Sequence, residues 1–137
     1  MSFLVDTTVL LEFTKPQPNN DLLAWLMGAD TDSLYLSTIT IFEVQVGIEL
    51  LPEGKRKRNL ARWLDEEIPD IYAGRILPVS AEVAIAGARI VAIARKSGWN
   101  DLEMDALIAA TAIIHRMPVA TMNRKHFERL GAELVAF

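Results

Sequence analysis

The sequence contains no cysteine among its 137 residues, which excludes disulfide bonds and any metal site built on thiolates. A reduced, cytoplasmic setting is the natural expectation for such a chain. Glycine and proline are scarce, with 7 Gly and 6 Pro. The sequence also shows no Gly-rich phosphate loop, no Ser/His/Asp set and no zinc-ligand spacing. Protein classes that depend on those motifs are therefore set aside.

Long apolar runs are missing as well. The longest, such as Ala106 to Ile114, fall far short of the roughly 20 residues that a membrane-spanning helix needs. The start, Met1-Ser2-Phe3, lacks the charged region of a signal peptide. With 137 residues and 51% hydrophobic content, the chain is long enough for one core and short for two. We expect a soluble protein with one domain over residues 1–137 and no membrane contact.

The chain has no excess of positive charge, because its formal net charge is −4. This argues against non-specific binding of nucleic acid by a broad basic surface. It leaves room for a nucleic-acid enzyme, because cations bound by carboxylates reverse the local charge. The basic residues fall into two groups, Lys55, Arg56, Lys57, Arg58 and Arg62, and then Arg124, Lys125 and Arg129. The first group is more readily interpreted as the solvated start of a helix.

Short apolar stretches alternate with helical patterns along the whole chain. The expected strands are 3–5, 34–36, 75–79 and 119–121, and 133–137 can add an edge strand. The expected helices begin after Asp6, near Leu22, at a capping box from Thr40 to Glu43, at Lys55 (running to Ile71), at Ser80, at Asp101 or Glu103, and at Lys125. Strands separated by helices predict an α/β fold, with a parallel central sheet of four to five strands flanked by helices.

This architecture brings acidic residues together. Asp6 follows the first strand, Glu43 lies shortly past the second, and Asp105 begins a helix that starts at the carboxyl edge of the sheet. Asn123 lies just past the fourth strand. Ligand sites of open α/β sheets lie at this edge. Each acid also has an ordinary interpretation, because Asp6 and Glu43 can cap helices and Asp105 can favour its helix through the macrodipole.

Clustered carboxylates without His or Cys form a hard oxygen site, which suits Mg²⁺ or Mn²⁺ better than zinc. Such ions usually hold phosphates and activate water for attack on a phosphodiester. The predicted reaction is therefore hydrolysis of a nucleic-acid backbone.

Four sequence blocks resemble the successive motifs of a PIN domain. They are Asp6-Thr7-Thr8-Val9-Leu10, Ser37 to Thr40 leading to Glu43 and Gly47, Asp105 to Ala112, and Ala120 to Asn123 with Phe127. The resemblance is greatest to the toxin ribonucleases of VapBC-type toxin–antitoxin modules. It implies a metal-dependent endoribonuclease, usually a homodimer, that is neutralised by a small antitoxin. DNA would be bound only through that antitoxin.

By position, Asp6, Glu43 and Asp105 match the acidic metal-site residues of that family. Thr7, Thr121 and Asn123 are expected beside the metal as supporting groups. The chain departs from the family pattern at Thr8, where Asn or Ser is commoner, at Asn123, which replaces a fourth acid, and at His126, where another acid often precedes Phe127. A second metal ion is therefore in question. Asp101 could replace the fourth acid only if the helix of Asp105 starts early enough to place both on one face.

Two other functions stay open at this stage. A catalytically silent PIN-like module that binds RNA or a protein partner is favoured by the missing fourth acid. A phosphohydrolase with Asp6 as covalent nucleophile is disfavoured, because such enzymes of the haloacid dehalogenase type need a second Asp where Thr8 stands.

Overall fold

The computed structural model describes all residues from 1 to 137 and contains one sheet of four parallel strands. The strands are β1 (Phe3–Val5), β2 (Leu34–Ser37), β3 (Ile76–Leu77) and β4 (Val119–Ala120), in the order β3-β2-β1-β4. The predicted parallel sheet is confirmed. The segment 133–137, which could add an edge strand, makes one parallel bridge, from Leu134 to Val119, and the sheet has four strands.

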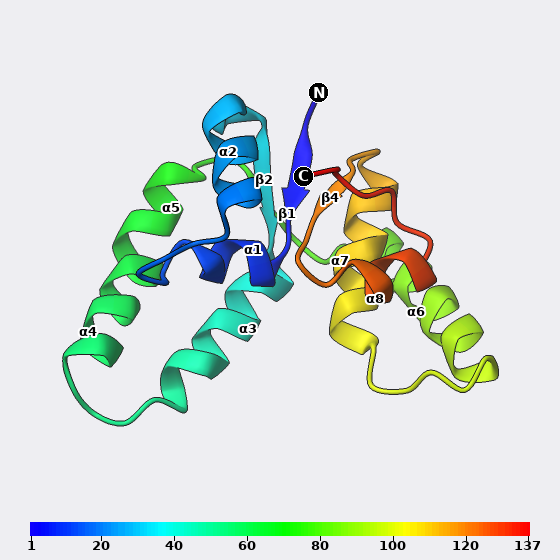
Figure 1. Ribbon diagram of the computed structural model, residues 1–137. Coiled ribbons are helices and arrows are strands. Elements are labelled where there is room, and N and C mark those ends of the chain that lie inside the picture. The colour runs from blue at the N-terminus through cyan, green and yellow to red at the C-terminus, as the bar shows by residue number, and fades with distance from the viewer.

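Helices follow each strand and cover both faces of the sheet (Figure 1). They are α1 (Thr7–Glu12), α2 (Asn20–Gly28), α3 (Thr38–Glu49), α4 (Lys55–Arg62), α5 (Ile68–Ile71), α6 (Ala81–Lys96), α7 (Glu103–Ile114) and α8 (Arg124–Arg129), with a 3₁₀ turn at Thr31–Ser33. A π-helical segment, Trp63–Glu67, joins α4 to α5. The helix predicted over 55–71 is therefore one element with a π segment in its middle.

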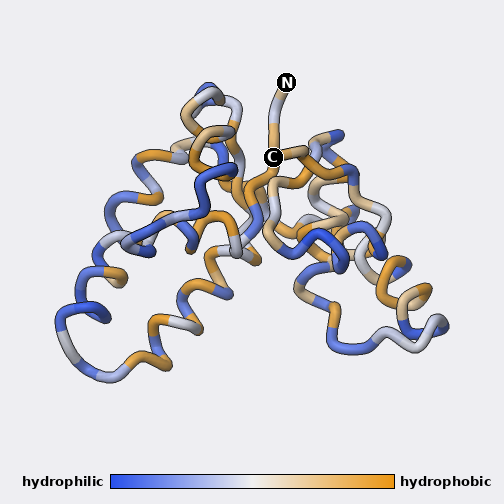
Figure 2. Tube along the Cα trace, in the orientation of Figure 1, coloured by the Kyte–Doolittle hydropathy of each residue, from blue (hydrophilic) through white to orange (hydrophobic).

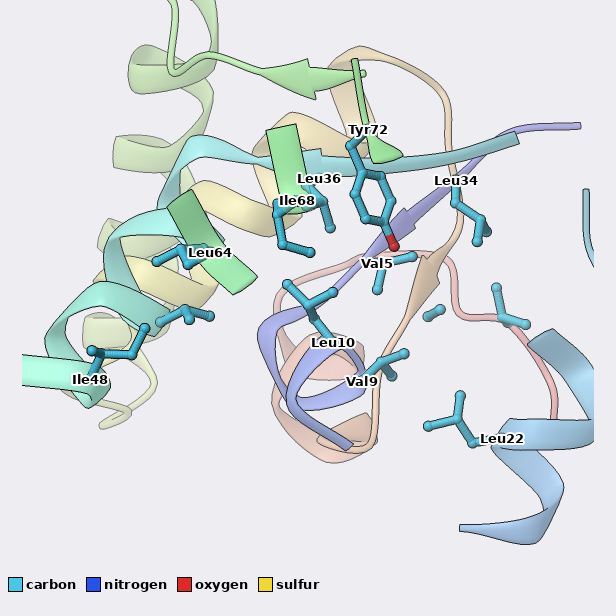
Figure 3. Close-up of a cluster of buried hydrophobic side chains, with 13 residues drawn as sticks. Val5, Val9, Leu10, Leu22, Leu34, Leu36, Ile48, Leu64, Ile68 and Tyr72 are labelled. Carbon is cyan, nitrogen blue, oxygen red and sulfur yellow. The ribbon is translucent and has the colours of Figure 1, made fainter. Parts of the chain in front are cut away.

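The core is divided between the two faces of the sheet. Alternation along the strands sends Val5 and Leu36 into one cluster, which α1, α3 and α5 cover (Figure 3). It sends Leu4 and Val119 into a second cluster with Phe127 and α7. The strands β1, β2 and β4 thus pack against helices on both faces, as expected of a parallel sheet, and the edge strand β3 is partly buried. This fixes the register of the strands and, with it, the positions of the residues that follow them.

The hydropathy of the residues differs between the sheet and the outer helix α4 (Figure 2). The central strands are largely hydrophobic, whereas α4, which carries the first basic group, is largely hydrophilic. No helix combines the length and the apolar character needed to cross a membrane.

The capping box predicted from Thr40 to Glu43 is wrong. The strand β2 runs directly into α3, and Ser37 is the N-cap, accepting a hydrogen bond from the Ile39 backbone N–H at 3.0 Å. Thr40 is already inside the first turn of α3 and fully buried. Because no linker separates the strand from the helix, Glu43 lies one turn inside α3 and is released from the helix terminus.

The apolar spacing after Ser80 predicts an inward face for α6, and this prediction is wrong at two of its positions. The predicted positions are Val83, Ile85, Ala86, Ile90, Ile93 and Ala94. Ile85 and Ile93 are exposed, whereas Val83, Gly87 and Ala94 are buried. A Cβ atom at Gly87 would lie 2.8 Å from Leu107 Cδ2. The helix therefore packs closely on α7 at Gly87, and Ile85 and Ile93 lie on the opposite side of α6.

Candidate functional site

Asp6 ends β1 and occupies the N-cap position of α1, but its side chain caps no backbone N–H. Its Oδ2 atom accepts hydrogen bonds from the Thr8 hydroxyl at 2.8 Å and from the Thr121 hydroxyl at 2.7 Å. The residue is only 2% exposed. An ordinary capping role is therefore excluded, and two hydroxyls from opposite ends of the chain hold the carboxylate in place.

The other carboxylate oxygen of Asp6 is left free. Both hydroxyl bonds go to Oδ2, and no completely buried side-chain oxygen in the chain lacks a partner. Oδ1 therefore retains access to solvent. A carboxylate fixed through one oxygen and open through the other is arranged as a ligand or a hydrogen-bond acceptor for something outside the fold.

Glu43 reaches the same region from α3. Its Oε1 atom accepts a hydrogen bond from the Thr7 hydroxyl at 2.7 Å, and that hydroxyl also lies 3.2 Å from the hydroxyl of Thr40. Burial raises the pKa of Glu43, and the charges of Asp6 and Asp105 raise it further, while the bond from Thr7 opposes the shift. The α3 carboxylate thus lies within the field of the other two acids.

Asp105 enters from the first turn of α7. Its Oδ2 atom lies 3.3 Å from His126 Nδ1, and the same ring nitrogen lies 2.7 Å from Asn123 Nδ2. Burial raises the pKa of Asp105 and so does the charge of Asp6, while His126 lowers it. Asp105 is therefore linked through His126 to the segment that follows β4.

Thr121 and Asn123 form the wall of the site at β4. The Thr121 hydroxyl is buried and accepts a hydrogen bond from the Asn123 backbone N–H at 2.9 Å. The Thr8 hydroxyl likewise accepts from the Met122 backbone N–H at 3.0 Å. These bonds tie the end of β4 to the start of α1, so that the two hydroxyls that orient Asp6 are themselves held.

The structure gathers all six predicted site residues at the carboxyl edge of the sheet, Asp6, Thr7, Glu43, Asp105, Thr121 and Asn123. As the side chains lie, no three Asp, Glu or His residues are close enough together to hold one ion. The donor chemistry nevertheless suits a divalent cation, because carboxylate and hydroxyl oxygens are hard ligands, and burial and the charge of Asp6 raise the pKa of both Glu43 and Asp105.

Asp101 does not join this group. The helix α7 begins at Glu103, and Asp101 precedes it as an exposed residue with φ of 61°. It therefore shares no helical face with Asp105, and the conditional role considered for it fails. Sequence reasoning instead missed Thr8 and His126, whose contacts with Asp6 and Asp105 depend on tertiary packing.

The repulsion among these acids should appear in the stability of the chain. A folded-state pKa of Asp105 above its unfolded value means that the contribution is stabilising below about pH 3.8 and is lost as pH rises through the raised pKa. We expect Asp105→Asn to raise the melting temperature at pH 7, without divalent ions, by roughly 3 °C, which corresponds to about 1 kcal/mol in a domain of this size. The gain should shrink toward pH 4.

Differential scanning calorimetry in EDTA measures this effect. The exposed residue Asp101 provides a control, since Asp101→Asn should leave the melting temperature unchanged at both pH values. An Asp105→Asn protein that melts lower than the parent at pH 7 contradicts the expectation.

The protein is thus an α/β protein with a parallel sheet, and three acidic residues lie at the carboxyl edge of that sheet. The PIN domain family model matches residues 3–133, and the chain belongs to that family. The family membership also decides against the Asp-nucleophile phosphohydrolase.

Individual relatives agree with this assignment. The chain is 40% identical over 134 residues to Toxin FitB of Neisseria gonorrhoeae, covering 98% of this chain and 95% of the relative. It is 35% identical over 132 residues to VapC ribonuclease Y4jK of Sinorhizobium fredii, covering 96% and 94%. The solved structure of FitAB bound to an IR36 DNA fragment superposes with a TM-score of 0.87 at 38% identity, covering 97% of this chain and 93% of that one.

Proposed function

We propose that this PIN domain is the ribonuclease toxin of a type II toxin–antitoxin module, a metal-dependent endoribonuclease that hydrolyses RNA phosphodiester bonds. The observation that carries the proposal is the state of Asp6, a buried carboxylate at an N-cap position that binds no backbone N–H. Burying a carboxylate that caps no helix, near two further acids, lowers the stability of the fold. Such an arrangement is typical of a functional site. The relatives named as a toxin and as a VapC ribonuclease support the same activity.

The three acids divide the work by position. Asp6, Glu43 and Asp105 would hold Mg²⁺ or Mn²⁺, which supplies positive charge to the scissile phosphate when bound. Thr8 and Thr121 orient Asp6 by donating to Oδ2, and Thr7 orients Glu43. The Asn123 amide lies beside His126 and can offer a neutral oxygen to the ion or to water.

Cleavage of RNA by the purified protein tests the proposal directly. A labelled single-stranded RNA should be cut internally in Mg²⁺ or Mn²⁺, left intact in EDTA, and cut again when the ion is restored. RNA that is bound but never cut in either ion would establish the catalytically silent module instead. The activity implies a cytoplasmic site of action, since cellular RNA is the substrate.

A small antitoxin is the partner that this function requires, and DNA binding would come only through it. The structural neighbour at 38% identity is FitAB bound to an IR36 DNA fragment. Co-expression of the chain with the product of a neighbouring small gene should give a complex that co-purifies.

We also expect a homodimer. The helix α3 and its C-cap residue expose an apolar row at four-residue spacing, Phe42, Val46 and Leu50, which are 56%, 43% and 80% exposed. Such a row on one helical face supports burial against a second copy. Light scattering at tens of micromolar should report about twice the monomer mass, and Phe42→Glu should lower it to that of the monomer. A parent protein that is monomeric without its partner contradicts the expectation.

The neutral amide at Asn123 limits how many ions the free protein can hold. Three carboxylates can bind one divalent ion tightly, whereas two adjacent ions repel and need more negative charge between them. Titration of Mn²⁺ by calorimetry should show one tight site in the parent and a gain of affinity for a second ion in Asn123→Asp. Asp101→Asn should titrate like the parent. Two equally tight Mn²⁺ sites in the parent would contradict the prediction of a single tight site.

A further inference from the structure

The second basic group of the sequence surrounds a cavity of about 420 Å³ beside the acidic site. Its walls are Met122, Asn123, Arg124, Lys125, His126 and Arg129. Two of these residues also belong to the acidic site, because His126 lies 3.3 Å from the Asp105 carboxylate and 2.7 Å from the Asn123 amide. The cavity is therefore the immediate continuation of the site toward α8.

The charges of this cavity differ in how they are held. The Arg124 guanidinium donates to the Val135 carbonyl at 2.6 Å, and the Arg129 guanidinium lies 5.0 Å from the centre of the Trp99 ring. These contacts hold both guanidinium groups in place, so that the two arginines give the cavity wall a positive charge. Lys125 is exposed and takes part in none of the salt bridges of the chain. Its ammonium group is free for a ligand.

The chemistry of the cavity selects an anion. Met122 is its one hydrophobic wall residue, so an apolar ligand finds little to contact. The backbone N–H groups of Met122 and Asn123 are already used by the hydroxyls of Thr8 and Thr121. Recognition therefore falls to cationic side chains, which bind a phosphate as charges rather than through a backbone nest.

Lys57 and Arg58 of the first basic group, on α4, are less suited to the same task. The Lys57 ammonium is taken up by the Glu53 carboxylate at 3.0 Å and by the carbonyls of Glu49 and Leu51. Arg58 lines a cavity that also contains the acids Asp65 and Glu66. Positive charge on that helix is partly neutralised within the fold, whereas no acidic residue lines the α8 cavity.

Resting on the proposed ribonuclease function, we propose that this cavity is the subsite for an RNA backbone phosphate that flanks the cleaved bond, and that Lys125 is its positioning residue. Three carboxylates repel an incoming polyanion, and a free cation next to them offsets that repulsion at the neighbouring phosphate. A subsite of this kind acts on the backbone, and contacts to phosphate carry no base preference.

The test compares Lys125→Ala with Arg58→Ala, which removes the same charge from the α4 cavity, and with Lys125→Arg, which keeps the charge. In steady-state cleavage of a short single-stranded RNA, Lys125→Ala should raise KM roughly three- to tenfold and change kcat less than twofold, since the contact positions substrate without touching the reacting atoms. Lys125→Arg should restore most of the loss, and Arg58→Ala should match the parent.

Binding is measured separately on the Glu43→Gln protein, which should not cut RNA. Glu43 is on α3 and does not line the α8 cavity. Fluorescence anisotropy with a labelled single-stranded RNA, at several salt concentrations in Mg²⁺, gives the slope of log affinity against log salt. Adding Lys125→Ala should reduce that slope by about 0.7, the value for one phosphate contact on a single strand. Arg58→Ala should leave it unchanged.

The outcomes separate this inference from the function on which it rests. If the parent never cuts RNA but Lys125→Ala reduces the salt slope of RNA binding as expected, the proposed ribonuclease activity is overturned and the phosphate subsite is supported. A parent that cuts RNA while Lys125→Ala keeps its KM and its salt slope overturns the subsite alone. Equal losses in Lys125→Ala and Arg58→Ala also overturn it, because they indicate general attraction rather than a localised contact.

Discussion

Asp105→Asn should reduce RNA cleavage by about 10³-fold or more, equivalent to roughly 4 kcal/mol of lost transition-state stabilisation. The substitution removes one charge from the acidic site at nearly constant volume. The site would then hold its divalent ion with Asp6 and Glu43 only, and His126 would lose its charged partner. The fold should survive, because Asp105 lies in the first turn of α7 and makes no capping bond there.

Glu103→Gln is the matched control for this prediction. Glu103 lies two residues earlier in the same turn of α7 and pairs with Arg95 at 2.6 Å, on the surface and away from the site. Its loss should leave the cleavage rate within twofold of the parent. Rates are measured on the same labelled RNA in Mg²⁺ and in Mn²⁺, with circular dichroism to confirm folding. If Asp105→Asn cuts as fast as the parent, Asp105 has no part in catalysis.

Phe127→Ala should lower the free energy of unfolding by about 3 to 5 kcal/mol, the range for deleting a buried phenylalanine side chain. Phe127 is completely buried, and it packs with Leu4, Ile108 and Val119 in the cluster that supports β1, α7 and β4. It is also the only buried residue of α8. Its loss should therefore loosen Lys125 and His126 as well as the core, with reduced RNA binding in the molecules that remain folded.

Urea denaturation at one fixed protein concentration measures the loss. Met27→Ala, which deletes an apolar side chain that is 80% exposed, should change the free energy by no more than about 0.5 kcal/mol. A Phe127→Ala protein as stable as Met27→Ala would show that α8 does not depend on its single anchor.

The sequence was sufficient to predict the sheet and the meeting of the three acids. Both follow from topology, since a carboxylate placed just past a parallel strand must lie at one edge whatever the details of packing. The helix starts were less predictable. Thr40 and Ser37 both carry a hydroxyl three residues or fewer before an apolar run. Ser37 is the N-cap of α3, because β2 ends at that residue.

Contacts that depend on how close two helices come could not be predicted. The apolar period of α6 predicted Ile85 and Ile93 inside, whereas the helix turns Gly87 toward α7 and leaves both isoleucines exposed. The roles of Thr8 and His126 escaped for a related reason. A threonine near a helix start and a histidine on a short helix are common surface residues, and only the folded chain shows that they touch Asp6 and Asp105.

The hydrogen bond from Thr121 to Asp6 joins residues 115 positions apart, and this separation has a consequence during protein synthesis. At the usual elongation rates a ribosome delivers Thr121 roughly 6 to 23 s after Asp6. Until β4 has emerged and paired with β1, Asp6 lacks this support and Asn123 and His126 are absent. The nascent chain therefore cannot assemble the complete acidic site before the segment that follows β4 has been synthesised.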